Sequence, residues 1–93
     1  MVKYRDHPPQ DSTYITQVDD LTADMAKTKI TIYNANAGGG GDFPEAICCG
    51  LNDCLNKLSW RDDAVKCVIL IADAPPHGLG KFILFNCKSY YFN

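Results

Sequence analysis

The stretch "GGGGDFPEAICCGL" (38–51) decides how this chain folds, because it places a glycine run directly before a helix signal. Pro44 suits the first position of a helix, where its missing N–H would have no partner. Asp42 or Phe43 would then precede the helix, and an aspartate there caps free N–H groups. Apolar residues recur at helical spacing, namely Ile47, Leu51, Cys54, Leu55 and Leu58. The stretch predicts a helix over about 44–58 with one apolar face.

A second apolar run follows this helix. The segment "AVKCVILIAD" (64–73) contains "CVILIA" and ends at Asp73, before the turn "APPHGLG". A continuous β-branched run is typical of a strand that is buried on both faces, so a buried strand is expected over about 65–72. The order of strand, helix and strand predicts an α/β fold with a parallel sheet.

The amino-terminal region has the pattern of a hairpin. "MVKYR" (1–5) and "TYITQV" (13–18) favour strands, and the prolines between them predict a turn over 6–12. Residues 19–37 are ambiguous, because helical spacing and the alternation of "KITIY" both occur there. We expect a helix that opens near Thr22.

The composition excludes several classes of protein. The chain has 93 residues, 46% of them hydrophobic, and a net charge of −2, which fits one small domain and offers no basic stripe for nucleic acid. No window is long and apolar enough for a membrane span, and the start is no signal peptide. Five cysteines, two of them adjacent, indicate reduced thiols and a cytoplasmic location.

Acidic residues mark the expected ligand-binding end of the sheet. In open parallel sheets, ligands bind beyond the carboxyl ends of the strands. The connectivity predicts that Asp6, Asp11, Asp42 and Asp73 converge there. Carboxylates favour Mg²⁺, Mn²⁺ or Ca²⁺. The glycine run is then a loop whose backbone comes close to the ion. The alternatives are that the glycines form a flexible linker and that Asp42 only caps the helix.

Four motifs together carry a resemblance to a known family: "YRDHPPQD", "GGGGDFPEA", "GLNDCLN" and "VILIADAPPHGLG". Over about residues 2–80 the chain resembles a von Willebrand factor type A domain, most closely the intracellular branch associated with alpha-type protein kinases. The resemblance implies a doubly wound, Rossmann-like α/β sheet with flanking helices. It also implies protein binding, often through a metal-ion-dependent adhesion site that holds Mg²⁺.

The resemblance extends to individual site residues. Asp73 matches the family's aspartate after the hydrophobic fourth strand, and Asp42 or the neighbouring Gly41 occupies the loop where the family has a threonine. The D-x-S-x-S motif of the family does not occur in this sequence. The implied metal ligands are therefore Asp73 and Asp42, and Mg²⁺ is expected to bind weakly or not at all. The implied partner-binding loop residues are Asp6, His7, Gly40, Gly41, Pro75 and His77.

The sequence thus predicts a partial von Willebrand A-like domain over 1–80, lacking its first strand, and an atypical tail over 81–93. Its expected function is non-catalytic protein binding, with an acidic side chain of the partner completing the metal shell. One alternative is a small hydrolase that uses Cys, His and Asp, although no local signature marks a nucleophile beside a base. Another is a nonfunctional remnant of a larger alpha-kinase-type protein.

Overall fold

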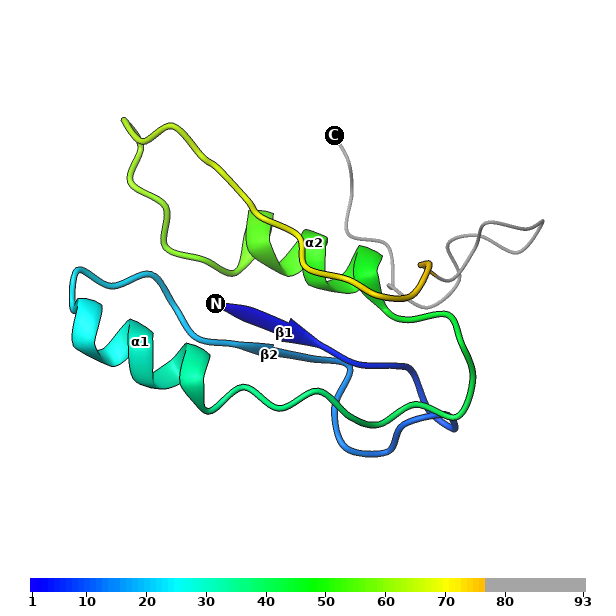
Figure 1. The fold of residues 1–93 in the computed structure, drawn as a ribbon. Coiled ribbons are helices and arrows are strands. Elements are labelled where there is room, and N and C mark those ends of the chain that lie inside the picture. Colours follow the sequence, from blue (N-terminus) through cyan, green and yellow to red (C-terminus); the bar gives the residue numbers. More distant parts are fainter. Residues whose placement is uncertain (77–93) are drawn as a thin grey trace.

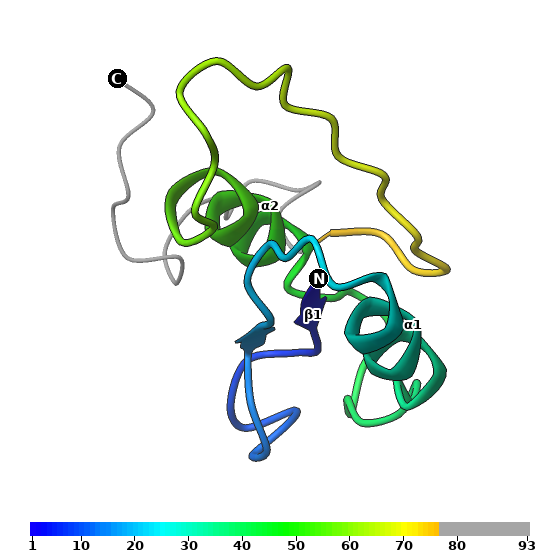
Figure 2. The ribbon, with the colours of Figure 1, turned by 90° about the vertical axis from the view of Figure 1, so that its left-hand side faces the viewer.

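The computed structural model describes residues 1–76, which form a two-stranded sheet and two helices. The elements are β1 (Val2–Tyr4), β2 (Thr16–Val18), α1 (Met25–Tyr33) and α2 (Ile47–Asn56). Helix α2 packs on both strands, whereas α1 contacts neither the strands nor α2 within the described residues. Figure 1 shows the chain returning from the end of α2 toward the start of that helix as an extended segment, and Figure 2 shows α1 on the opposite side of β1 from α2.

The predicted hairpin is confirmed, with shorter strands than expected. β1 and β2 pair antiparallel, with Val2 opposite Val18 and Tyr4 opposite Thr16. The turn between them is closed by two N–H groups, those of Gln10 and Asp11, which donate to the carbonyl of His7. Two prolines in this turn remove backbone donors, which ends the strand pairing on the amino-terminal side.

Helix α1 is present but begins at Met25 instead of near Thr22. Asp24 caps it, because its side chain accepts a hydrogen bond from the N–H of Lys27 at 3.0 Å. The alternative of a strand at "KITIY" is wrong. None of the residues of α1 is buried, and its apolar residues Met25 and Ile32 are exposed.

Helix α2 also begins later than predicted, at Ile47 instead of Pro44. Its N-cap is Ala46, which makes no side-chain cap, so Asp42 does not cap the helix. The reason lies in the backbone before the helix. Glu45 N–H donates to the carbonyl of Pro75 at 3.0 Å, and Ala46 N–H donates to that of Arg5 at 2.9 Å. These two tertiary hydrogen bonds hold residues 45–46 out of the helix.

The buried face of α2 differs from the predicted apolar stripe. Ile47, Gly50 and Asp53 are buried, while Leu51 and Leu55 are exposed. The Tyr4 side chain packs on Gly50 so closely that a Cβ there would lie 3.1 Å from the tyrosine ring. Asp53 accepts from the Thr16 hydroxyl at 2.6 Å and from Lys57 Nζ at 2.8 Å. The helix therefore docks through a glycine and a buried carboxylate.

The predicted buried strand over 65–72 is wrong. Within the described residues this segment belongs to no strand, and Val65 is 94% exposed. Exposure then alternates from Val68 to Ile71 as 43, 83, 49 and 87%, which is the period of an extended chain. A strand needs hydrogen-bonded neighbours, and within the described residues the segment 65–72 has none, because the isolated parallel bridge to Glu45 is made by Pro76, beyond its end.

Several predictions about the whole domain extend past these residues. The doubly wound sheet stays a prediction, because the described part contains only the hairpin and its helices. The boundary at residue 80, the tail 81–93 and His77 lie outside the described residues. Neither helix in residues 1–76 is long and apolar enough to cross a membrane. The cytoplasmic location stays a prediction.

The docking of α2 predicts the effect of removing its buried carboxylate. Asp53→Ala leaves the Thr16 hydroxyl without its acceptor, so we expect the free energy of unfolding to fall by about 1–3 kcal/mol. Asp63→Ala is the matched control, because the side chain of Asp63 is 91% exposed and should matter by less than about 0.5 kcal/mol. Urea denaturation of both variants measures the difference. Equal effects of the two substitutions would contradict this account of the docking.

Candidate functional site

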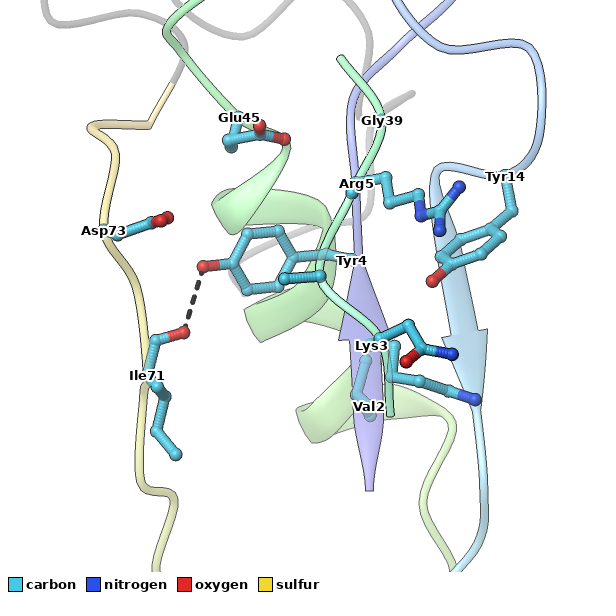
Figure 3. Close-up of a pocket in the computed structure, with 12 residues that line it drawn as sticks. Val2, Lys3, Tyr4, Arg5, Tyr14, Gly39, Glu45, Ile71 and Asp73 are labelled. Carbon is cyan, nitrogen blue, oxygen red and sulfur yellow. Dashed lines mark hydrogen bonds between the residues drawn. The ribbon is translucent and has the colours of Figure 1, made fainter. Parts of the chain in front are cut away.

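A cavity of about 530 Å³ lies where β1 meets loops from three other parts of the chain. Figure 3 shows Tyr4 and Arg5 at the end of β1, the glycine loop at Gly39, and Glu45 and Asp73 on the side opposite Tyr14. We call this the loop-end cavity. It brings together segments that are as far apart in the sequence as residues 4 and 73.

The glycine run forms one wall of the loop-end cavity by packing against the turn after β1. Gly39 and Gly40 have φ angles of +92° and +83°, which favour glycine. A Cβ on Gly39 would lie 1.9 Å from Asp11 Oδ2. Gly41 lies beside Gln10, with ordinary space for a Cβ. The close approach, and not a free linker, explains why glycine stands at position 39.

Asp11 is the anchor that this loop approaches. Its Oδ1 accepts hydrogen bonds from the N–H and the hydroxyl of Thr13, at 2.7 and 2.5 Å. Its Oδ2 lies 3.7 Å from Arg5 Nη1, and Arg5 also donates to Thr13 at 2.9 Å and stacks 4.8 Å from the Tyr14 ring centre. The hydrogen bonds from Thr13 lower the pKa of Asp11, and Arg5 and Gly40 lower it further. The charge of Arg5 is thus compensated within its own turn.

The opposite side of the loop-end cavity is acidic. Burial first, and then the charges of Glu45 and Asp73, raise the pKa of Tyr4. The Tyr4 hydroxyl donates to the carbonyl of Ile71 at 3.3 Å, and Figure 3 shows the Glu45 and Asp73 carboxylates beyond it. The electrostatic potential around this hydroxyl is therefore negative, which favours a cationic group in the cavity.

The two predicted metal ligands do not line the same cavity. Asp73 lines the loop-end cavity, whereas Asp42 is exposed and does not line it. Glu45, from the same "GGGGDFPEA" motif, stands there instead. Sequence reasoning did not select Glu45, because this residue was expected in the first turn of a helix that begins at Pro44.

The remaining predicted residues have different environments. Asp6 and Asp11 are buried in the turn after β1, with exposed fractions of 0 and 5%. Gly40 and Gly41 belong to the glycine loop, and Pro75 accepts the hydrogen bond from Glu45. Tyr4 and Arg5 also line the loop-end cavity, and sequence reasoning did not select them.

The described residues do not fit a closed Mg²⁺ site. Within 1–76, no group of three or more His, Cys, Asp or Glu side chains could hold a metal ion. Mg²⁺ requires a near-octahedral shell of oxygen ligands, and the loop-end cavity offers the carboxylates of Glu45 and Asp73 for it. A Mg²⁺ site at Asp42 and Asp73 stays a prediction from the resemblance.

A second cluster bears on the hydrolase alternative. Cys49 Sγ lies 3.3 Å from His7 Nε2, and His7 Nδ1 lies 3.7 Å from Asp6 Oδ1. This order of sulfur, imidazole and carboxylate is that of a nucleophile with its base. However, Cys49 is disulfide-bonded, so its sulfur is no nucleophile. The prediction of reduced thiols is therefore wrong for Cys49, while Cys48, Cys54 and Cys67 are free.

Comparison with known proteins connects part of this chain to the alpha-type protein kinases. The chain is similar to "Alpha-protein kinase vwkA" of Dictyostelium discoideum, with 48% identity over 47 residues. The match covers 50% of this chain and 7% of the relative. No family model and no solved structure matches. The alpha-kinase part of the predicted resemblance is thus supported, and the von Willebrand A part stays a prediction.

The packing of the glycine loop predicts unequal effects of two neighbouring substitutions. Gly39→Ala places a Cβ on Asp11 and keeps a positive φ, so we expect the free energy of unfolding to fall by about 1–3 kcal/mol. Gly38→Ala meets no atom within 4 Å and should be neutral or stabilising by up to about 1 kcal/mol. Denaturant unfolding tests the pair. Similar stability of the two variants would show that the loop does not pack as described.

The lowered pKa of Asp11 predicts a pH dependence. Because the pKa is lower in the folded state than its ordinary 3.8, stability from Asp11 is present above pH 3.8 and is lost as the pH falls through the folded value. Thr13→Val removes the largest cause and should raise the pKa of Asp11 toward 3.8. Titration of the Asp11 carboxyl by NMR measures this, with Ser12→Ala as the control. An unchanged titration in Thr13→Val would refute the assignment.

Proposed function

We propose that this chain is a non-catalytic protein-binding segment related to alpha-type protein kinases, and that the loop-end cavity is its contact surface. The observation that carries the proposal is the convergence of β1, the glycine loop, Glu45 and Asp73 on one cavity. Loops held at the end of a rigid element are the usual place for binding residues. The partial match to an alpha-protein kinase supports the relationship.

The charges in the loop-end cavity indicate the chemistry of the partner. Glu45 and Asp73 both act on Tyr4, while Arg5 is engaged by Asp11, Thr13 and Tyr14. Lys3 also lines the cavity but pairs with Asp19 at 3.6 Å, so the side of the cavity at Glu45 and Asp73 is negative. A basic side chain of a partner protein fits it directly. The adhesion-site arrangement, in which Mg²⁺ joins the cavity to an acidic partner, is the competing prediction from the resemblance.

A remnant of a larger alpha-kinase-type protein is the second candidate. The matched residues make up 7% of the relative. In addition, the buried apolar side chains within residues 1–76 are those of Ala46 and Ile47. So small a core gives little stability, since folding free energies depend on buried apolar area. Such a remnant would show no cooperative unfolding transition and no binding at the loop-end cavity.

We predict that a basic peptide binds the loop-end cavity, as measured by NMR on the isotopically labelled chain. The probe is a capped Gly-Arg-Gly-Arg-Gly peptide, and its acidic analogue has glutamate in place of arginine. We expect the basic peptide to shift the NMR signals of Tyr4, Glu45 and Asp73, with or without Mg²⁺. Asp73→Asn should weaken binding by about threefold to tenfold, as the loss of one charge contact of roughly 1 kcal/mol implies. Asp62→Asn, a change at an exposed residue outside the cavity, should not weaken it.

The other outcomes separate the alternatives. Binding of the acidic peptide only in the presence of Mg²⁺ would favour the adhesion-site arrangement over direct binding. Absence of shifts with either peptide, together with a melting curve that shows no cooperative transition, would favour the remnant. Cooperative folding without any shift would refute the assignment of the loop-end cavity as the contact surface.

A further inference from the structure

The sulfur of the disulfide-bonded Cys49 lies beside a histidine. Cys49 Sγ is 3.3 Å from His7 Nε2, although the two residues are 42 positions apart in the sequence. This contact joins the turn after β1 to the first turn of α2. An imidazole next to a disulfide can carry the proton that thiol–disulfide exchange requires. The pair is therefore placed for chemistry that a plain covalent cross-link does not need.

A carboxylate lies behind this imidazole. Asp6 Oδ1 is 3.7 Å from His7 Nδ1, which is the ring nitrogen that does not face the sulfur. The same oxygen accepts a hydrogen bond from the backbone N–H of His7 at 2.7 Å, and the Asp6 side chain is fully buried. Asp6 is therefore held in place. It offers a counter-charge to the imidazolium that exists while His7 carries two protons.

The position of Cys49 in α2 also favours a thiolate. Cys49 is the third residue of this helix of 10 residues, so its sulfur belongs to the first turn, where the helix dipole places partial positive charge. No acidic residue stands in this turn, and the N-cap residue Ala46 makes no side-chain hydrogen bond to it. Cysteines at helix N-termini or beside histidines form thiolates most readily. Cys49 combines both features.

The neighbouring acidic groups are engaged elsewhere. Asp53, one turn further along α2, accepts hydrogen bonds from two donors on other residues. Glu45, which precedes α2, lines the loop-end cavity. His7 is thus the ionisable group placed to exchange a proton with Cys49.

We propose that Cys49 is a thiol–disulfide exchange site, with His7 as its proton carrier and Asp6 as the residue that positions His7. The co-reactant is a small dithiol. One thiolate of the dithiol attacks the sulfur bonded to Cys49, the S–S bond breaks, and its electron pair leaves on Cys49 Sγ, which takes a proton from His7.

The second thiol of the reductant completes the exchange. It loses its proton to solvent and attacks the first sulfur of the reductant, which releases the cysteine that was bonded to Cys49 as a thiolate that is then protonated. The dithiol becomes a disulfide, two protein thiols form, and two electrons have passed to the protein. The inference does not rest on the function proposed for the loop-end cavity.

The first test requires no substitution. The full chain is reduced with dithiothreitol, freed of the reductant and treated with iodoacetamide at pH 6, and peptide mass spectrometry follows each cysteine. Cys49 should react about tenfold faster than Cys48 and Cys67, because at this pH the gain in thiolate outweighs the loss in nucleophilicity. Cys48 shares the first turn of α2 but is more exposed than Cys49. Accessibility alone therefore predicts the opposite order.

Matched variants assign the roles. His7→Gln keeps a hydrogen-bonding side chain that cannot carry the proton, so it should slow reduction of the Cys49 disulfide by dithiothreitol at pH 7 by about tenfold. Asp6→Asn should slow it by about threefold and should add nothing to His7→Gln, because Asp6 acts through His7. Cys48→Ser, a change at the adjacent free thiol, is the control and should leave the rate unchanged.

Three results would overturn the proposal. The first is alkylation of Cys49 no faster than that of Cys48 in the reduced chain. The second is an unchanged rate of reduction in His7→Gln. The third is reduction of the disulfide only in urea that unfolds the chain, which would make it a structural cross-link. The alkylation comparison uses the unchanged sequence, so it decides the matter even if Asp6→Asn does not fold.

Discussion

The backbone of Glu45 and Ala46 holds the described structure together. Ala46 donates a hydrogen bond to Arg5 at the end of β1, and Glu45 donates one to Pro75 after the extended segment. These adjacent residues join three segments that are distant in the sequence, and they set where α2 begins. The buried apolar side chains of residues 1–76, Ala46 and Ile47, lie at the same junction. The loop-end cavity adjoins this junction at Glu45.

The small core leaves much apolar surface exposed. Val65, Ile69 and Ile71 are among the exposed apolar residues. Exposed apolar patches mark surfaces where another chain can pack.

The loop-end cavity is polar and has a negative side at Glu45 and Asp73. Tyr4 connects this cavity to α2 and to the extended segment, since its ring packs on Gly50 and its hydroxyl donates to the carbonyl of Ile71. The arrangement is consistent with the proposed binding segment that is related to part of an alpha-type protein kinase.

Local sequence patterns determined the hairpin, the proline turn and the existence of both helices, because these depend on alternation, helical spacing and proline chemistry within a few residues. The sequence also predicted that the glycine run forms a loop whose backbone comes close to another group, which is why glycine is needed at position 39. Only the tertiary structure decided that the approach is to Asp11, that Glu45 and not Asp42 joins Asp73, and that Asp53 is buried. The run "CVILIA" shows the reason most plainly. Its composition favours a buried strand, but a strand exists only when neighbouring backbones form hydrogen bonds with it, and within the described residues this run forms none.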